Sequence, residues 1–354
     1  MTMTGEGDGN GFRSYRKGFS FLLLASLLII CIVWDIAGRD GVVQFYSPSI
    51  LPYIQNASVP RDVSSSDINI TRTALPPVTS TTAKLVNPHN FQYVFQGNST
   101  CVRRNNTDVY LLICVCVAPA NFKHREVIRN TWGSITKYNL EVRLIFLIAK
   151  TKNETTQSKI NNESKEYNDI VQEDFVDSYR NLSLKSVAML RWAMSYCNSA
   201  KYVLKADDDM FINVPYLIGV LKHKHITNSV IGMLIQGARP IHNPASKWHT
   251  PQELYKEAVY PPYLSGTAYV ISGDIVSKLF HASQMTPLFW LEDVYITGLC
   301  RRKIGANAVA DYGFTYSHRS PTGCAYQHII TGHDNTLEEI EKIWRELQDP
   351  NMKC

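Results

Sequence analysis

Apolar runs of strand length alternate with stretches of helical periodicity over the second two-thirds of the chain. Apolar residues dominate Val109–Val117, Val142–Lys150 and Lys201–Ala206, as is typical of strands buried on both faces of a sheet. The pattern predicts helices over 123–132 and 183–197. The second helix has an apolar face with spacings of 3, 4 and 3, formed by Val187, Leu190, Met194 and Cys197. This alternation predicts an α/β fold in which helices cover both faces of a mostly parallel sheet.

The last predicted helix carries its own start signal. It begins at Asn335 or Thr336, and Glu338 or Glu339 three residues further on completes a capping box. Its buried stripe is predicted to consist of Leu337, Ile340, Trp344 and Leu347. The compact part of the chain therefore continues almost to the C-terminus.

The N-terminal region has a different pattern. Phe19–Trp34 contains no charged residue and, at about 1.5 Å per residue, spans roughly 24 Å. Residues up to Ala37 extend this run towards the thickness of a secretory-pathway membrane. Basic residues stand before it, namely Arg13, Arg16 and Lys17, and the positive-inside rule places that end in the cytosol. We expect a cytoplasmic tail over 1–18 and a signal-anchor transmembrane helix over 19–37.

The alternative for this segment is a cleaved signal peptide. Its best small-residue site, Ala37-Gly38, has Asp35 at the −3 position, which is unfavourable for cleavage. The anchor is therefore favoured, and everything after it is expected to be luminal. N-glycosylation sequons agree with this location, at Asn56, Asn69, Asn98, Asn105, Asn153, Asn162 and Asn181.

Two further regions follow the predicted anchor. Residues 38–105 are rich in Ser, Thr, Pro and Asn and have no helical or strand period, which predicts a flexible luminal stem. Residues 106–354 contain the alternating pattern described above, and they form the predicted catalytic domain.

Composition narrows the class of protein. The chain is 45% hydrophobic and 19% charged, so it can bury a core. Its 36 Lys and Arg against 31 Asp and Glu give a mild net charge of +5, and we expect no nucleic-acid partner. There are eight cysteines, of which Cys31 lies in the predicted anchor. The other seven predict two or three disulfides of open connectivity. Because seven is odd, at least one cysteine stays free or pairs between chains, and Cys114 and Cys116 are read as buried thiols on one strand face.

Three consecutive aspartates follow the third predicted strand. Asp207, Asp208 and Asp209 come directly after Tyr202–Ala206, and ligands bind at the carboxyl ends of strands in open α/β sheets. Adjacent carboxylates repel one another unless a cation lies among them, and oxygen ligands suit Mg²⁺ or Mn²⁺. We expect a divalent metal here that bridges the protein to a diphosphate, in preference to a solvated acidic turn.

A second acidic pair, Glu292-Asp293, lies between Trp290 and an apolar stretch with helical character. A carboxylate in apolar surroundings can have a raised pKa, which suits a general base. Taken alone, an N-terminal helix cap is the simpler reading.

Three other features are less specific. Arg125 and Arg129 are spaced i, i+4 and either clamp phosphates or form a solvated basic face. Tyr260–Thr267 is a Pro-containing turn that either shapes a sugar pocket or is a plain loop. His333 is one of ten histidines, and only its place among the other motifs suggests that it is a metal ligand.

Six ordered motifs carry a resemblance over about Tyr110 to Cys354. They are RxxIRxTW (Arg125–Trp132), EDFxDSYxNLSLK (Glu173–Lys185), YVLKxDDD (Tyr202–Asp209), YPPYxSGT (Tyr260–Thr267), LEDVYxxGLC (Leu291–Cys300) and the late Cys324, Tyr326 and His333. In these motifs the chain resembles the β-1,3-galactosyltransferase family, glycosyltransferase family 31.

The resemblance implies a GT-A type fold, Rossmann-like with a mostly parallel sheet, and an inverting, Mn²⁺-dependent transfer from a UDP-sugar, with Mg²⁺ as a second possibility. It further implies a single-pass type II Golgi membrane protein with a luminal catalytic domain. Asp293 would be the catalytic base, and Asp209 and His333 the metal ligands. The residues implied to bind the donor are Arg125, Arg129, Lys185, Asp207, Asp208, Tyr263, Ser265, Gly266 and Glu292.

The donor sugar is predicted from individual residues within the shared motifs. Ser265-Gly266-Thr267 and Leu291 before Glu292 look more like the galactosyl members than the N-acetylglucosaminyl members. Asp208 and Ala268 depart from the commoner galactosyl pattern. We therefore expect transfer of galactose from UDP-galactose to an oligosaccharide of a glycoprotein or glycolipid, with UDP-GlcNAc as the alternative donor.

Two non-enzymatic alternatives are weaker. A luminal chaperone or lectin of the same fold would be expected to lose the acidic triplet or the base, and both are present. A membrane-anchored adhesion protein would more often be all-β, unlike the alternation seen here.

Overall fold

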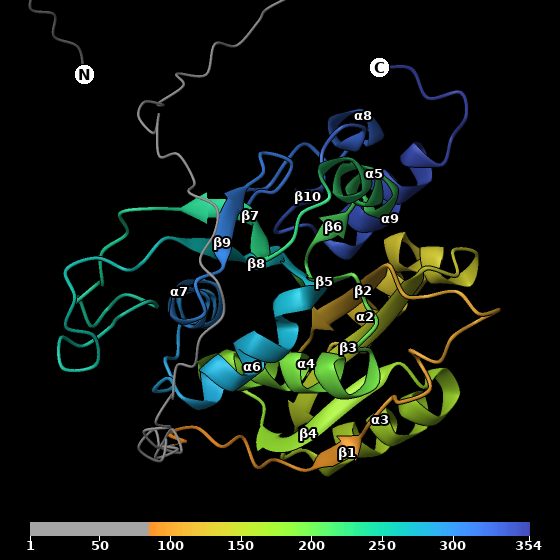
Figure 1. The fold of residues 1–354 in the computed structure, drawn as a ribbon. Coiled ribbons are helices and arrows are strands. Elements are labelled where there is room, and N and C mark those ends of the chain that lie inside the picture. Colours follow the sequence, from red (N-terminus) through yellow and green to blue (C-terminus); the bar gives the residue numbers. More distant parts are fainter. Residues whose placement is uncertain (1–84) are drawn as a thin grey trace, which may run out of the picture. The chain divides into compact units, whose positions relative to one another are not determined.

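The structure, a computed structural model, describes residues 85–354 (Figure 1). The predicted tail (1–18), signal anchor (19–37) and the stem up to residue 84 lie outside the described residues. Among residues 85–354, no helix is both long enough and apolar enough to cross a membrane.

One large sheet organises this part of the chain. Its eight strands, in spatial order, are β1 (Tyr93–Phe95), β4 (Ile170–Val176), β3 (Val142–Lys150), β2 (Leu111–Cys116), β5 (Tyr202–Asp207), β8 (Tyr263–Ser272), β7 (Ser229–Ile235) and β9 (Asn307–Ala310). A separate two-stranded sheet pairs β6 (Phe211–Ile212) with β10 (Thr331–Gly332).

Helices connect and cover these strands (Figure 1). The longer ones are α2 (Phe122–Asn130), α3 (Glu154–Tyr167), α4 (Leu182–Tyr196), α5 (Val214–Lys224), α6 (Val276–Gln284) and α9 (Leu337–Leu347). The shorter ones are α7 (Arg301–Lys303), α8 (Gly323–Tyr326), the 3-10 turns η1 (Trp132–Lys137), η2 (Tyr179–Asn181) and η3 (Gly273–Ile275), and the π-helix η4 (Val294–Cys300).

The sheet is mostly parallel, as predicted, with one inserted antiparallel strand. β4, β3, β2 and β5 run in one direction, and β7 and β9 share that direction. β8 runs against both of its neighbours, β5 and β7, and β1 runs against β4. The apolar pattern of the sequence could not predict that β8 is antiparallel, because a strand buried on both faces is apolar at every position whichever way it runs.

Alternating side chains of the central strands enter two separate cores. In β2, Leu112, Cys114 and Cys116 pack on the face covered by α4 and α6, whereas Leu111, Ile113 and Val115 pack on the face covered by α2, α5 and α9. Burial on both faces explains why the run is apolar at every position. It also confirms Cys114 and Cys116 as buried thiols on one strand face.

The predicted helices are present, and the cap of the last one is confirmed. Thr336 is the N-cap of α9 and forms a capping box with Glu339. Ile340 is buried as predicted, and Ile343 joins it, whereas Leu337, Trp344 and Leu347 are only partly buried.

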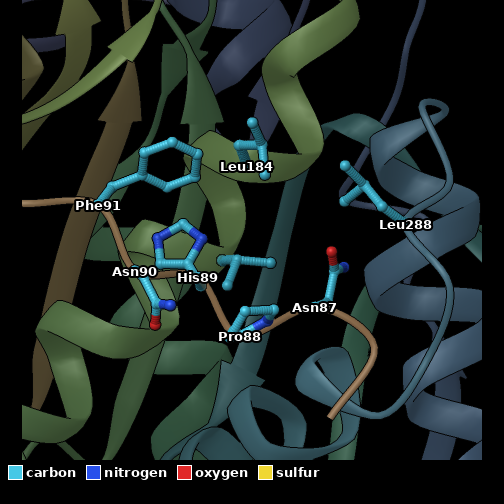
Figure 2. A pocket seen from close by; sticks show the side chains of 8 residues that line it. Asn87, Pro88, His89, Asn90, Phe91, Leu184 and Leu288 are labelled. Carbon is cyan, nitrogen blue, oxygen red and sulfur yellow. The ribbon is translucent and has the colours of Figure 1, made fainter.

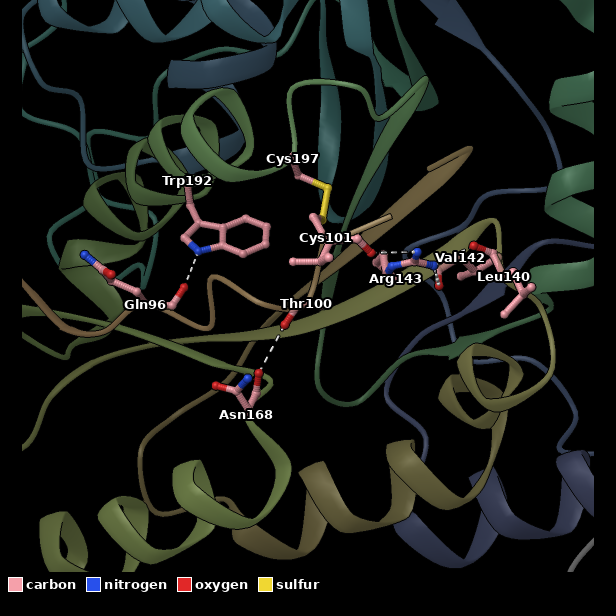
Figure 3. Close-up of a disulfide and its surroundings, with 10 residues drawn as sticks. Gln96, Thr100, Cys101, Leu140, Val142, Arg143, Asn168, Trp192 and Cys197 are labelled. Atoms are coloured by element: carbon pink, nitrogen blue, oxygen red, sulfur yellow. Dashed lines mark hydrogen bonds between the residues drawn. A yellow bond between two sulfur atoms is a disulfide. The ribbon is translucent and has the colours of Figure 1, made fainter. Parts of the chain in front are cut away.

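Two disulfides join distant segments, in agreement with the predicted number. Cys101 is bonded to Cys197 at the end of α4 (Figure 3), and Cys324 is bonded to Cys354 near the C-terminus. The free cysteines among the described residues are Cys114, Cys116 and Cys300, all buried.

The folded unit begins before residue 106. β1 adds to the sheet edge, Cys101 is disulfide-bonded, and buried His89 contacts Glu173 of β4 at 2.8 Å. Residues 87–91 also border a cavity of 370 Å³ against α4 (Figure 2), whose lining is mostly apolar and contains none of the predicted site residues. The last part of the predicted stem, from residue 85, therefore packs with the catalytic domain.

Candidate active site

The acidic triplet lies where the predicted strand ends. Asp207 is the last residue of β5 and is in register with Cys116 at the end of β2. After the turn, β6 pairs with β10, and this pairing places Gly332 opposite Phe211. His333, which follows Gly332, thereby reaches Asp209, with 3.3 Å between Nε2 and Oδ2.

Asp209 and His333 have the properties of a metal-binding pair. The Oδ1 atom of Asp209 is buried and has no hydrogen-bond partner among the described residues. The Nδ1 atom of His333 is 3.0 Å from the backbone carbonyl of Tyr316, so the N–H is held there and Nε2 points to the carboxylate. The hydrogen bond with Asp209 raises the pKa of His333, and His333 lowers the pKa of Asp209 against the effect of its burial.

These two residues fit a hard divalent cation that also binds substrate. No three His, Cys, Asp or Glu side chains within residues 85–354 are grouped to hold a metal by themselves. Mg²⁺ and Mn²⁺ sites commonly use one or two protein ligands together with substrate phosphates and water, so a pair is compatible with the predicted metal.

A buried lysine, which the motif analysis had not singled out, joins the two acidic motifs. Lys205 of β5 is 2% exposed, and its Nζ lies 2.5 Å from Asp207 and 3.9 Å from Glu292. Burial lowers the pKa of Lys205, but the charges of Asp207 and Glu292 outweigh this effect and the pKa is raised. Burial raises the pKa of Asp207 to about 6 in spite of the ion pair. A lysine within an otherwise buried strand, two residues before an aspartate, was the available signal.

Asp293 is a helix cap, as the simpler reading of its motif predicts, and its role as a general base stays a prediction. It is the N-cap residue of η4, and its Oδ1 accepts a hydrogen bond of 2.8 Å from the N–H of Val294. Burial, followed by the negative charge of Glu292, raises the pKa of Asp293 to about 7. A carboxyl that titrates near neutral pH has the proton affinity of an effective general base.

β8 holds the second acidic pair in place. Tyr269 donates a hydrogen bond of 2.6 Å to Glu292, and the carbonyl of Gly266 accepts one from Lys205. A Cβ at position 266 would lie 3.2 Å from the Cβ of Asp293 and 3.3 Å from Oε2 of Glu292. Glycine is therefore the residue that lets β8 approach both carboxylates.

Of the other predicted residues of β8, Tyr263 lies near this pair, and Ser265 contacts Thr267. Ser265 is buried and shares a hydrogen bond of 3.1 Å with Thr267. Tyr263 is half-buried, and burial and the charge of Asp293 raise its pKa. Asp208 accepts a hydrogen bond of 2.7 Å at its Oδ2 from the side chain of Asn121.

The structure gives Arg125 and Arg129 a different role from the predicted phosphate clamp. Arg125 is fully buried, and its guanidinium group binds Glu163 of α3, at 2.6 and 2.9 Å, and the carbonyls of Ala118 and Pro119. Arg129 binds Glu163 and Asp169 at 2.7 to 2.8 Å. Their charges are thus neutralised within the protein, and Arg125 fixes the loop that follows β2.

Lys185 is likewise committed to the protein. It is buried, and its Nζ lies 2.8 Å from Asp177 and 2.9 Å from the carbonyl of Val117 at the end of β2. It positions the strand end beside Asp207 without presenting a free ammonium group. Sequence spacing alone could not reveal the acidic partners of these three cations, because they come from α3 and from the segments around β4.

Aromatic and basic side chains from three segments of the chain cluster near Asp293. The rings of Tyr179 and Trp290 are 6.3 Å apart, and Arg180 stacks over Trp290 at 3.8 Å. Lys247 lies over the rings of Tyr179 and Trp248 at 5.5 and 5.2 Å. Burial raises the pKa of Tyr179, and the charge of Asp293 adds to this shift.

The sequence model that describes galactosyltransferases matches residues 123–311, which include the acidic triplet and Asp293. The chain belongs to the galactosyltransferase family. Family membership makes it a glycosyltransferase and confirms the resemblance seen in the motifs. His333 lies beyond the matched residues.

Individual relatives differ in the sugar that their names give. Human β-1,3-galactosyltransferase 1 is 34% identical over 274 residues, covering 76% of this chain and 82% of the human protein. Lactosylceramide 1,3-N-acetyl-β-D-glucosaminyltransferase A of Xenopus laevis is 30% identical over 353 residues, covering 96% of this chain and 89% of the frog protein. Among solved structures, a 4-diphosphocytidyl-2C-methyl-D-erythritol synthase from Anaerococcus prevotii has a TM-score of 0.37 at 12% identity, covering 68% of this chain and 99% of that one.

Proposed function

We propose that this galactosyltransferase-family member has a GT-A type fold and transfers galactose from UDP-galactose in β-1,3 linkage, with inversion, to a terminal sugar of a glycoprotein or glycolipid. The observation that carries the proposal is the partly buried Asp293 carboxyl, whose pKa is about 7, in one site with the Asp209–His333 pair. Lys205 links the two halves of this site through Asp207 and Glu292.

Asp293 acts on the acceptor in the proposed reaction. The acceptor hydroxyl oxygen attacks the anomeric carbon of the donor sugar, and its proton passes to the carboxylate of Asp293. The bond between the anomeric carbon and the phosphate oxygen breaks in the same displacement, and its electron pair leaves with UDP. A carboxylate held by the N–H of Val294 is fixed in orientation before the acceptor arrives.

Asp209 and His333 would hold a Mn²⁺ or Mg²⁺ ion, which when bound supplies positive charge to the diphosphate of the leaving UDP. The unpartnered Oδ1 of Asp209 supports this assignment. Lys205 keeps Asp207 and Glu292 together and places positive charge between the two acidic motifs. Arg125 and Lys185 fix the loop after β2 by donating hydrogen bonds to the carbonyls of Ala118 and Val117.

The acceptor approaches from the aromatic side in this proposal. Sugar rings present C–H groups that pack on aromatic faces, and Tyr179, Trp248 and Trp290 offer such faces near Asp293. Tyr263 and Gly266 of β8 lie beside the carboxylates, and together with Ser265 they would shape the donor-sugar pocket.

The compartment is part of the same proposal. A type II Golgi membrane protein with a luminal catalytic domain is supported by the apolar run at 19–37 and by the sequons. The Cys101–Cys197 and Cys324–Cys354 disulfides suit an oxidising compartment.

The alternative donor is UDP-GlcNAc, favoured by the frog relative that aligns along 96% of this chain. The two are separated by assaying the full-length chain with UDP-galactose and UDP-GlcNAc against acceptors that end in GlcNAc, GalNAc or galactose, in Mn²⁺, in Mg²⁺ and with a chelator. We expect chelator-sensitive galactose transfer and a β-1,3 product by linkage analysis. Transfer of GlcNAc instead establishes the alternative, and no transfer from either donor overturns the proposal.

A further inference from the structure

A second cavity, with a mainly polar lining, lies at the opposite end of the parallel strands from the acidic triplet. It has a volume of 390 Å³ and is bordered by the loop 99–104, the end of α2, η1 and the starts of β3 and β4. Its lining includes four cationic side chains, those of Arg104, Arg129, Lys137 and Arg143.

Arg143 is the most unusual of these side chains. It is the second residue of β3 and is 1% exposed. Its guanidinium group donates to the backbone carbonyls of Leu140, Val142 (Figure 3) and Val102, at 2.6, 3.0 and 3.3 Å. The Nε–H has no partner among the described residues. A buried cation usually requires a counter-ion, and neutral carbonyls do not supply one.

Only one of the four cations is neutralised. Arg129 binds the carboxylates of Glu163 and Asp169, which use up the acidic groups at this cavity. Arg104, Lys137 and Arg143 take part in no ion pair within residues 85–354; Arg104 donates only to the carbonyl of Thr136, at 3.3 Å. Burial lowers the pKa of Arg143, and the positive charge of Arg104 lowers it further.

We infer that this cavity binds a tetrahedral oxyanion, a sulfate or phosphate group, through Arg143, Arg104 and Lys137. The unpartnered Nε–H of Arg143 is the donor that the anion would satisfy, and Arg104 and Lys137 would add charge from the rim. The hydroxyl group of Ser99 also lines the cavity and can donate to an oxyanion oxygen, whereas those of Thr100 and Thr136 already donate to the carbonyls of Asn168 and Gly133. The inference does not depend on the donor or acceptor proposed above.

Two measurements on the full-length chain test the inference: the temperature of thermal unfolding and the heat of binding in a calorimetric titration. Both use sodium sulfate, sodium phosphate and N-acetylglucosamine 6-sulfate as ligands, and sodium chloride at equal ionic strength is the reference. Sulfate stabilises many proteins non-specifically, so saturation of the effect and its loss in variants are the readouts. A stronger response to the sugar sulfate than to the inorganic ions would identify an ester group as the ligand; equal responses would identify the free ion.

Arg104→Met is the main variant, because its side chain makes one backbone contact and its loss should leave the fold intact. Arg103→Met is the matched control, since Arg103 is adjacent in sequence but pairs with Asp108 outside the cavity lining. We expect Arg104→Met to bind at least about tenfold more weakly and Arg103→Met to bind normally.

Arg143→Lys keeps the charge in place and removes the planar fork, so it should also weaken binding while preserving the fold. The inference is overturned if the ions give no saturable response in the unmodified chain. It is also overturned if Arg104→Met and Arg143→Lys respond like the Arg103→Met control.

Discussion

Lys205 and Arg143 are both buried cations on inner strands of one sheet, yet their surroundings are opposite. Lys205 lies near the carboxyl end of β5 with Asp207 and Glu292 within 4 Å, and its pKa is raised. Arg143 lies near the amino end of β3, binds only backbone carbonyls, and its pKa is lowered. Lys205 thus has carboxylate partners at one end of the strands, and Arg143 has none among residues 85–354 at the other end.

This difference shows that the charged groups around a buried cation indicate the charge of the ligand that would bind there. At the carboxyl end the protein provides more negative than positive groups, which suits a cation and a proton-accepting base. At the amino end it provides more positive than negative groups, which suits an anion. Desolvation penalises both lysine and arginine, so the missing partner at Arg143 is informative only because Lys205 shows the usual solution in the same sheet.

The largest expected effect is on turnover. Asp293→Asn should lower kcat by about 10²- to 10⁴-fold, because the amide cannot accept the acceptor's proton, while UDP binding stays within a few-fold. Steady-state kinetics and calorimetric UDP titration measure the two effects. Asp108→Asn, an exposed carboxylate, is the control. Near-normal turnover of Asp293→Asn would show that another group is the base.

The two buried cations should differ in stability. Lys205→Met leaves Asp207 and Glu292 without their counter-ion and should cost about 3–5 kcal/mol of unfolding free energy. Arg143→Met removes an unpaired charge along with its backbone hydrogen bonds, so the loss should stay below about 2 kcal/mol. Urea denaturation measures both. Equal losses would contradict the contrast between the two ends of the sheet.

The pH dependence should separate activity from stability at the carboxyl end. In the proposed mechanism Asp293 is active as the carboxylate, so kcat/KM should rise about tenfold between pH 6 and pH 8 and then level off. Its folded pKa lies above the ordinary value of 3.8, so the folded state holds this proton more tightly than the unfolded state. The contribution of this group to stability should therefore be full below pH 3.8 and be lost as pH rises to about 7.

The free energy of unfolding is measured as a function of pH for the unmodified chain and for Asp293→Asn. The difference between the two profiles gives the contribution of the Asp293 carboxyl. The falling contribution should disappear in the variant. A kcat/KM profile that is flat from pH 5 to 8 would be inconsistent with the raised pKa of Asp293.

The smallest expected effect comes from Gly266→Ala. The added methyl would lie 3.2 to 3.3 Å from Asp293 and Glu292, so these groups must move by a few tenths of an ångström. We expect a several-fold loss of kcat with little change in stability, because displacement of a base by a fraction of an ångström is enough to affect transfer. Gly219→Ala, where the methyl meets nothing within 4 Å, is the control. A loss of stability without a loss of kcat would assign Gly266 to folding alone.

Local signals in the sequence predicted much of the fold. The apolar runs gave β2, β3 and β5, the helical period gave α4, and Thr336 with Glu339 gave the start of α9. The direction of β8 and the entry of residues 85–105 into the unit were not predictable, since both depend on pairing between distant segments.

The candidate site divides in the same way. Asp207 to Asp209 and Asp293 were found because each follows a recognisable local pattern. The partners of Arg125 and Lys185 were missed, because Glu163 and Asp177 meet them only in the folded chain. Lys205 was missed for a different reason: its place within an apolar strand was a signal, but its second partner, Glu292, comes from a distant segment.

The pairing of β6 with β10 has a practical consequence for anyone who shortens this protein. The two short strands bring His333 to Asp209 from 124 positions further along the chain. A fragment that stops at residue 311, where the family match ends, keeps the aspartate triplet but loses the imidazole and the strand that delivers it. Such a fragment would therefore keep only one of the two residues proposed to hold the metal ion.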